Sequence, residues 1–178
     1  QSSQINGTEA TVTGRQLEHL TSVHQADKGG SVRVGQVNGL MGNGLIKSIN
    51  TERAVLDINL DTPAPAPLPL KLIMAMPRPK MLRRCLQSIS SLGVKEIYLI
   101  NSKRVEKSFW QTPFLSDEAI QNELILGLEQ SRDTILPKVY LRKLFKPFIE
   151  DELGDLIKNT KALVAHPSGT NNCPINIQ

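Results

Sequence analysis

The chain has 178 residues, of which 39% are hydrophobic and only 4% aromatic, and its net charge at pH 7 is +4. This composition excludes wholesale disorder and predicts a core of aliphatic side chains in one large domain or two small ones. The mild positive charge is compatible with a polyanionic partner but does not identify one.

Residues 1–61 are expected to form a small β-barrel, because apolar and polar residues alternate in three segments of this part of the chain. Turns between the strands are predicted at Asn38-Gly39 and at Gly42-Asn43-Gly44. A short helix is predicted over 14–23. The predicted strands are 32–37, 44–49 and 54–60.

Prolines alternate with other residues between Thr62 and Pro69. Proline lacks a backbone N–H and favours an extended path, so residues 62–69 are predicted to be a linker rather than part of a folded element.

Residues 70–178 show strands that alternate with helices. Gly93 is a predicted helix C-terminal cap, Ser116 a predicted N-cap, and Pro147 a predicted first helical residue. The predicted strands are 70–76, 96–100, 138–141 and 161–165, and the predicted helices are 79–92, 116–131 and 147–158. This order predicts an α/β domain with an open parallel sheet, helices on both faces, and ligands at the carboxyl ends of the strands.

The two cysteines are too few for a disulfide framework, which favours a reducing, cytoplasmic setting. Cys85 falls in an apolar helical pattern and is expected to be a small buried side chain. No apolar stretch approaches the roughly 20 residues of a membrane span, so no membrane association is expected. The three histidines are far apart and have no cysteine pair nearby, so no metal site is expected.

Positive side chains gather near the predicted strand ends and would attract phosphates if they formed one basic rim. They are Arg78, Lys80, Arg83, Arg84, Lys103, Arg104, Lys107, Arg132, Arg142, Lys143 and Lys146. Scattered, solvated charge is the alternative, and charge alone favours it. The chain has no Walker loop and no Gly-x-Gly-x-x-Gly after a strand, which disfavours a small-molecule enzyme on an open α/β sheet.

Several motifs follow one another in a consistent order along nearly the whole chain. They are Glu18–Val23, Val32–Gly35, Asn38-Gly39, Gly44–Ile46, Met74–Val94, Ser102–Val105, Glu129–Arg132 with Pro137, and Ala162–Pro167. In this order they resemble the ribosomal RNA small subunit methyltransferase E family, a SPOUT-class family. The resemblance implies a PUA-like, RNA-binding barrel over 1–61 and a SPOUT methyltransferase domain over 70–178.

The same resemblance implies an enzyme that uses S-adenosyl-L-methionine (SAM) to methylate N3 of a uridine in 16S rRNA of the small ribosomal subunit. It also implies a homodimer with a C-terminal trefoil knot. His24-Gln25 replaces the family's Leu-Arg, and Ser91 replaces a Glu. Residues 168–178 stand where the family has a glycine-rich knot loop, so the chain is expected to lack most of the donor site and to be inactive alone.

The resemblance points to Arg104, Gln130 and Arg132 as catalytic residues, whose donors would stabilise negative charge on the uracil oxygens when N3 loses its proton. For Arg132, a charge that interacts with a helix dipole is an equal alternative. His166 and Pro167 are the implied SAM contacts, although His166 equally suits a cap after a strand. The expected RNA-binding residues are Arg15, Arg33, Arg78, Lys80, Arg84, Lys103 and Arg142. The competing hypothesis for the chain is a non-catalytic RNA-binding or scaffold remnant of the enzyme.

Overall fold

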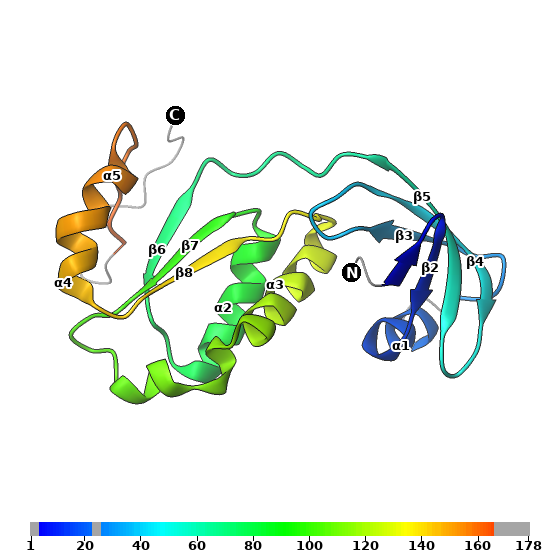
Figure 1. Cartoon of the computed structure of the whole chain (residues 1–178), viewed down its shortest axis with the longest axis horizontal. Coiled ribbons are helices and arrows are strands. Elements are labelled where there is room, and N and C mark those ends of the chain that lie inside the picture. The colour runs from blue at the N-terminus through cyan, green and yellow to red at the C-terminus, as the bar shows by residue number, and fades with distance from the viewer. Residues whose placement is uncertain (1–3, 23–25, 166–178) are drawn as a thin grey trace. The chain divides into compact units, whose positions relative to one another are not determined.

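The computed structural model describes residues 4–22 and 26–165, and the chain divides into two compact units, residues 1–143 and 144–178. The first unit contains an antiparallel sheet followed by a parallel sheet with two long helices (Figure 1). The expected division into a barrel, a linker and an α/β domain stays a prediction.

The first sheet has the strand order β1-β2-β5-β4-β3, and all its neighbouring strands are antiparallel. Alternation in β4 and β5 buries Ile46, Leu56 and Ile58 together with Ala10. The three predicted strands and the helix are confirmed, whereas the short β1 and β2 were not predicted. The elements are β1 (Ile5–Asn6), β2 (Glu9–Val12), α1 (Gly14–Ser22), β3 (Ser31–Gly35), β4 (Met41–Ile49) and β5 (Ala54–Thr62).

The two predicted turns have different outcomes. The Asn38-Gly39 turn is confirmed, with Asn38 in the left-handed region at φ 58°. The prediction at Gly42-Asn43-Gly44 is wrong, because these residues lie inside β4. The register shifts beside Gly42, and a Cβ there would lie 1.8 Å from the Asn59 carbonyl oxygen. Gly42 therefore permits a close backbone approach at a bulge rather than a reversal of the chain.

The second sheet is parallel, with the strand order β6-β7-β8. The predicted caps are confirmed, because the Ser116 hydroxyl accepts a hydrogen bond from the Ala119 N–H and Gly93 follows α2 at φ 83°. The elements are β6 (Lys71–Ala75), α2 (Pro79–Ser91), β7 (Glu96–Ile100), the 3₁₀ helices η2 (Lys107–Gln111) and η3 (Pro113–Leu115), α3 (Asp117–Ser131) and β8 (Lys138–Arg142).

Helices α2 and α3 lie on the same face of the parallel sheet (Figure 1), where Leu82, Leu86 and Leu124 pack against Ile97 and Leu99. Helices were expected on both faces. The strands of this unit follow one another in chain order, so right-handed crossovers put both connecting helices on one side.

The second unit begins with a helical segment that starts two residues before the predicted Pro147. Proline is tolerated in this first turn because the first N–H groups of a helix have no intrahelical acceptor. The predicted strand over 161–165 is wrong: these residues are exposed without regular structure, and Val164 is 91% exposed. The helical elements are α4 (Phe145–Pro147), the π-helical η4 (Phe148–Glu152) and α5 (Leu153–Ile157). Across the described residues, no helix has the length and apolar character needed to span a membrane.

Candidate functional site

The carboxyl ends of the three parallel strands form one level edge. Ala75, Ile100 and Arg142 are register partners across the sheet. Beyond them, the Met76 N–H donates to the Ile100 carbonyl oxygen (2.9 Å) and the Asn101 N–H to that of Arg142 (3.1 Å). Segments that leave strands at one edge can contact one ligand together, which makes this edge the first candidate site.

The start of α2 brings three cations to this edge. Arg78 is the N-cap residue, Pro79 follows at the first helical position, and the side chains of Arg78, Lys80 and Arg84 are exposed. The first N–H groups of a helix carry partial positive charge, and the cations add to it. The arrangement attracts anions such as phosphate.

Arg83 lies near the same end of α2, but its side chain makes contacts that stabilise the fold. Its guanidinium contacts the carboxylate of Glu123, which is 7% exposed, and lies 5.2 Å from the centre of the Phe114 ring. The Gln87 side-chain amide also donates to Glu123. A buried carboxylate needs such partners, so Arg83 joins α2 to α3, and the Glu123 carboxylate balances the charge of Arg83 although the Arg83 side chain is 49% exposed.

The loop after β7 is shaped by Asn101. Its side-chain oxygen accepts hydrogen bonds from the Ser102 N–H (3.0 Å) and the Trp110 indole N–H (3.4 Å). The loop between them presents the exposed Lys103 and Arg104. The sequence placed Asn101 at a predicted strand end but gave its side chain no role, and it missed Trp110, although the chain's single Trp was a visible signal.

Arg142 ends β8 in a different environment. Its guanidinium lies 5.7 Å from the centre of the Tyr140 ring, and Tyr140 stacks on Tyr98 with ring centres 4.6 Å apart. Burial, followed by the nearby Glu96 carboxylate, raises the pKa of Tyr98 to about 12. The phenol therefore stays neutral at physiological pH.

Gln130 and Arg132 lie at the opposite, amino edge of the sheet. Helix α3 runs antiparallel to the strands and ends there, where Asp133 forms an ion pair with Lys95, the residue before β7. Both side chains are exposed, and Arg132 is the left-handed C-cap of α3 at φ 56°. The structure therefore separates these two residues from Arg104, and Arg132 does not belong to the basic rim that the sequence allowed at the carboxyl edge.

The two expected RNA contacts of the N-terminal sheet differ in their surroundings. Arg15 of α1 makes two hydrogen bonds to the Glu129 carboxylate, at 2.7 and 2.8 Å. Arg33 is exposed on β3, which has β4 as its neighbour in the sheet. His166 and Pro167, the expected SAM contacts, lie outside the described residues.

A hollow of about 800 Å³ lies beside α1 and the β4–β5 turn. Its lining includes the carboxylates of Glu18, Asp27 and Glu52. These acidic groups repel phosphate, so the hollow is not a candidate for an RNA backbone.

Residues 64–177 match the family model described as the RNA methyltransferase domain. This match covers more than half of the chain and defines its class. Over 153 residues the chain is 32% identical to ribosomal RNA small subunit methyltransferase E of Treponema pallidum, which covers 80% of this chain and 57% of the relative. The chain belongs to the ribosomal RNA small subunit methyltransferase E family.

Solved structures show the same fold. A predicted RNA methyltransferase of Thermotoga maritima aligns with a TM-score of 0.59 and 18% identity, over 79% of this chain and 62% of that one. Ribosomal RNA small subunit methyltransferase E of Neisseria gonorrhoeae, bound to SAM, aligns with a TM-score of 0.57 and 17% identity, over 83% and 62%. The chain thus spans less than two thirds of the length of these relatives.

Proposed function

We propose that the protein transfers a methyl group from SAM to N3 of a uridine in 16S rRNA of the small ribosomal subunit, in the cytoplasm and as a homodimer when complete. The family membership supports the reaction class, and the SAM-bound relative supports the donor. The observation that carries the RNA substrate is the set of exposed cations at the carboxyl edge, which we call the carboxyl-edge cations. They are Arg78, Lys80, Arg84, Lys103 and Arg104.

The chemistry requires an accessible pairing edge, because N3 of uracil carries a proton and lies in the base pair. When N3 gives up its proton to solvent, negative charge spreads onto O2 and O4. This charge would be neutralised as the N3–C bond forms and the bond between the methyl carbon and the donor's sulfur breaks. A fixed cationic donor beside those oxygens stabilises this charge. We assign that role to Arg104, which the Asn101–Trp110 loop holds at the carboxyl edge.

Gln130 and Arg132 cannot meet the same base as Arg104 of the same chain, because they lie at the opposite edge of the sheet. We propose that they contact the RNA backbone beside the N-terminal sheet. Arg33, exposed on that sheet, is proposed to contribute there too.

When bound, SAM supplies an electrophilic methyl group on a positively charged sulfonium. The carboxyl-edge cations suit the phosphates of RNA, whereas the sulfonium is itself positive, so we assign these cations to the RNA and not to the donor. His166 and Pro167 remain the proposed donor contacts, and we derive no step through them.

The test is methyl transfer from radiolabelled SAM to unmodified small ribosomal subunits, with the 178-residue chain and the complete gene product in parallel. We expect the complete product to label 16S rRNA and the modified uridine to stop reverse transcriptase, because N3 methylation blocks pairing. Arg104→Lys should lower the labelling rate more than the RNA affinity, since it removes the planar fork but keeps the charge.

The matched control is Lys28→Arg, at an exposed position of the N-terminal part, which should leave both quantities unchanged. Labelling by the complete product alone would support the expectation that this chain is inactive by itself. If neither protein labels the RNA but both bind it, the non-catalytic RNA-binding scaffold becomes the better account.

A further inference from the structure

Among the described residues, three connections join the N-terminal sheet to the parallel sheet of the first unit. The covalent connection is the proline-rich segment 62–69, which has no regular structure beyond Thr62 and is mostly exposed. Near its end, the Leu68 N–H donates to the Gly93 carbonyl oxygen (3.2 Å). An exposed, extended segment limits the separation of two bodies but does not fix their mutual orientation. The other two connections are polar contacts between the sheets.

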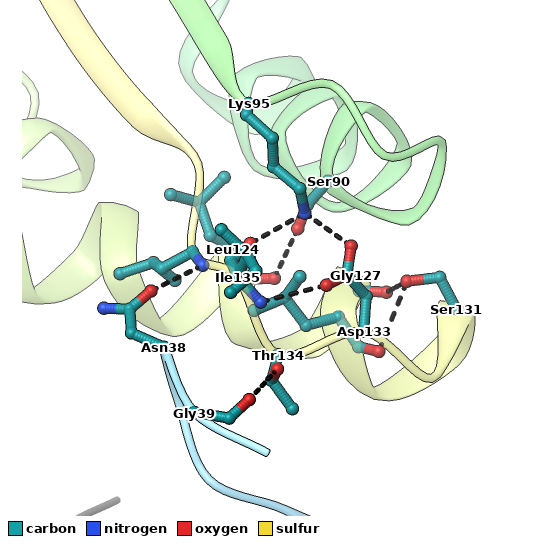
Figure 2. A network of polar contacts seen from close by, with 12 residues as sticks. Asn38, Gly39, Ser90, Lys95, Leu124, Gly127, Ser131, Asp133, Thr134 and Ile135 are labelled. Carbon is teal, nitrogen blue, oxygen red and sulfur yellow. Dashed lines mark hydrogen bonds and ion pairs between the residues drawn. The ribbon is translucent and has the colours of Figure 1, made fainter. Parts of the chain in front are cut away.

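The first polar contact joins the β3–β4 turn to the loop between α3 and β8 (Figure 2). The Asn38 N–H donates to the Thr134 carbonyl oxygen (2.7 Å), and the Thr134 hydroxyl donates to that of Gly39 (2.5 Å). The Leu136 N–H donates to the Asn38 side-chain oxygen (2.9 Å). Thr134 is only 5% exposed, and a Cβ at Gly35 would lie 2.6 Å from its methyl group. The β3–β4 turn and the α3–β8 loop are therefore in close contact, and their hydrogen bonds point in different directions.

The loop that carries Thr134 is itself held on the parallel sheet. Asp133 pairs with Lys95, and their side chains are 5% and 13% exposed. The Lys95 ammonium also donates to the Ile135 carbonyl oxygen (2.7 Å), and the Ile135 N–H donates to the Asp133 carboxylate (2.9 Å). Figure 2 shows that Lys95 binds both neighbours of Thr134 in the chain, Asp133 and Ile135. Because the loop is held in this way, the β3–β4 turn cannot move relative to the parallel sheet without breaking its hydrogen bonds to the loop.

The second polar contact is the pair between Arg15 and Glu129, with Gln16 as a further donor to Glu129 (3.1 Å). The side chains of Arg15 and Glu129 are 51% and 37% exposed. Exposed ion pairs are screened by water and salt and contribute little to the stability of a contact. The buried contact at Thr134 is therefore the one that can set the orientation.

We propose that Thr134 is a positioning residue, which with Asn38 fixes the orientation of the N-terminal sheet on the parallel sheet so that cations of both sheets contact one RNA together. This inference rests on the proposed function for its RNA part. Two linked binding surfaces reinforce each other only when their geometry lets both engage at once. An N-terminal sheet that turns freely spends part of its time in orientations that do not bind, and the apparent affinity falls by that fraction.

The test compares Thr134→Val, which keeps the shape of the side chain but removes the hydroxyl, with Thr134→Ser, which keeps the hydroxyl. Asn38→Gly keeps the left-handed backbone and removes the side-chain acceptor. Thr51→Val, at an exposed turn of the same sheet, is the matched control. All are made in the full 178-residue chain.

The first readout is the set of amide residual dipolar couplings of the two sheets. We expect one alignment tensor to fit both sheets in the wild type, Thr134→Ser and Thr51→Val. In Thr134→Val and Asn38→Gly the two sheets should need different tensors, although each sheet keeps its own fold. A single tensor in Thr134→Val equal to that of the wild type would overturn the proposal. If Thr134→Val does not fold, the comparison is made with Asn38→Gly, and a single tensor equal to that of the wild type would again overturn the proposal.

The second readout is affinity for a fragment of small-subunit rRNA. We expect Thr134→Val to bind about threefold to tenfold more weakly, with recovery in Thr134→Ser, as for a partly populated competent state. Diverging tensors with unchanged affinity would refute the positioning role and leave a purely structural contact. If the wild type itself does not bind this RNA, the RNA part of the inference fails, and the tensors alone decide whether Thr134 sets the orientation; methyl transfer by the complete product tests the proposed function separately.

Discussion

Tyr98 shows how one side chain couples the parallel sheet to pH. Ile97 and Leu99 pack toward α2 and α3, so the intervening Tyr98 points to the other face of β7. There it stacks on Tyr140, and its hydroxyl donates to the Glu96 carboxylate (3.2 Å). Burial and this carboxylate both disfavour the phenolate, so the pKa of Tyr98 rises to about 12 from 10.0.

This shift predicts a loss of stability at alkaline pH. Between the unfolded and folded pKa values, the unfolded chain has released the proton while the folded chain still holds it, so rising pH favours unfolding. The contribution is fully present below pH 10 and is lost as the pH rises through the folded pKa. Urea unfolding at about pH 8 and about pH 11.5 should show a loss on the order of 2 kcal/mol that is missing in Tyr98→Phe. An equal loss in Tyr98→Phe would assign the alkaline effect to other groups.

At the scale of elements, α2 and α3 pack closely because small residues face each other. Ser90 is buried and its hydroxyl donates to the Leu124 carbonyl oxygen (2.8 Å). A Cβ at Gly127 would lie 2.3 Å from the Gln87 carbonyl oxygen and 2.7 Å from the Ser90 Cβ. The backbone of α2 leaves no room there, so the distance between the helices depends on Gly127.

Gly127→Ala is therefore expected to destabilise the protein. The clash forces the helices apart, and overpacking of this kind costs about 1–3 kcal/mol, more than the roughly 1 kcal/mol that alanine gains over glycine inside a helix. The measurement is the free energy of unfolding in urea. Gly154→Ala in α5 is the matched control, because a Cβ there meets nothing within 4 Å, and it should be neutral or stabilising. Comparable losses in both variants would contradict the packing argument.

The sequence predicted elements well where the signal is local. The apolar spacing of α2 and α3, the Ser116 cap and the Gly93 end are all encoded within a few neighbouring residues, and the structure confirms them. The strand predicted at 161–165 failed because an apolar run becomes a strand only beside a partner. The Gly42 prediction failed because its reason is the carbonyl group of Asn59 on the next strand.

The predictions for the candidate site succeeded or failed for the same reason. Basic residues after β6 and β7 were predictable at the carboxyl edge, because parallel strands end together. The separation of Arg104 from Gln130 and Arg132 was not predictable, because it depends on α3 running from the carboxyl edge of the sheet to the amino edge. Thr134 gave no signal at all, because its partner Gly39 is 95 positions away in the chain.

At the scale of the whole molecule, the carboxyl-edge cations predict a salt-dependent RNA affinity. Each phosphate neutralised by a cation releases counterions, so the logarithm of the binding constant falls linearly with the logarithm of salt concentration. Removing one contacting cation, as in Arg84→Ala, should weaken binding and reduce this slope by about 1. Lys28→Ala, also exposed but away from this edge, should leave the slope unchanged. An unaltered slope in Arg84→Ala would remove that residue from the RNA interface.

The contact at Thr134 also has a consequence for the order of events during synthesis. Each strand of the N-terminal sheet pairs with others made within the first 62 residues, and β6 and β7 can pair before β8 exists. The contact at Thr134 can form only after residue 134 has left the ribosome, and closing a loop between distant residues costs conformational entropy before the contact forms. The first sheet can therefore be complete while its orientation on the parallel sheet is still unfixed, and formation of the Thr134 contact is expected to be a late step in folding.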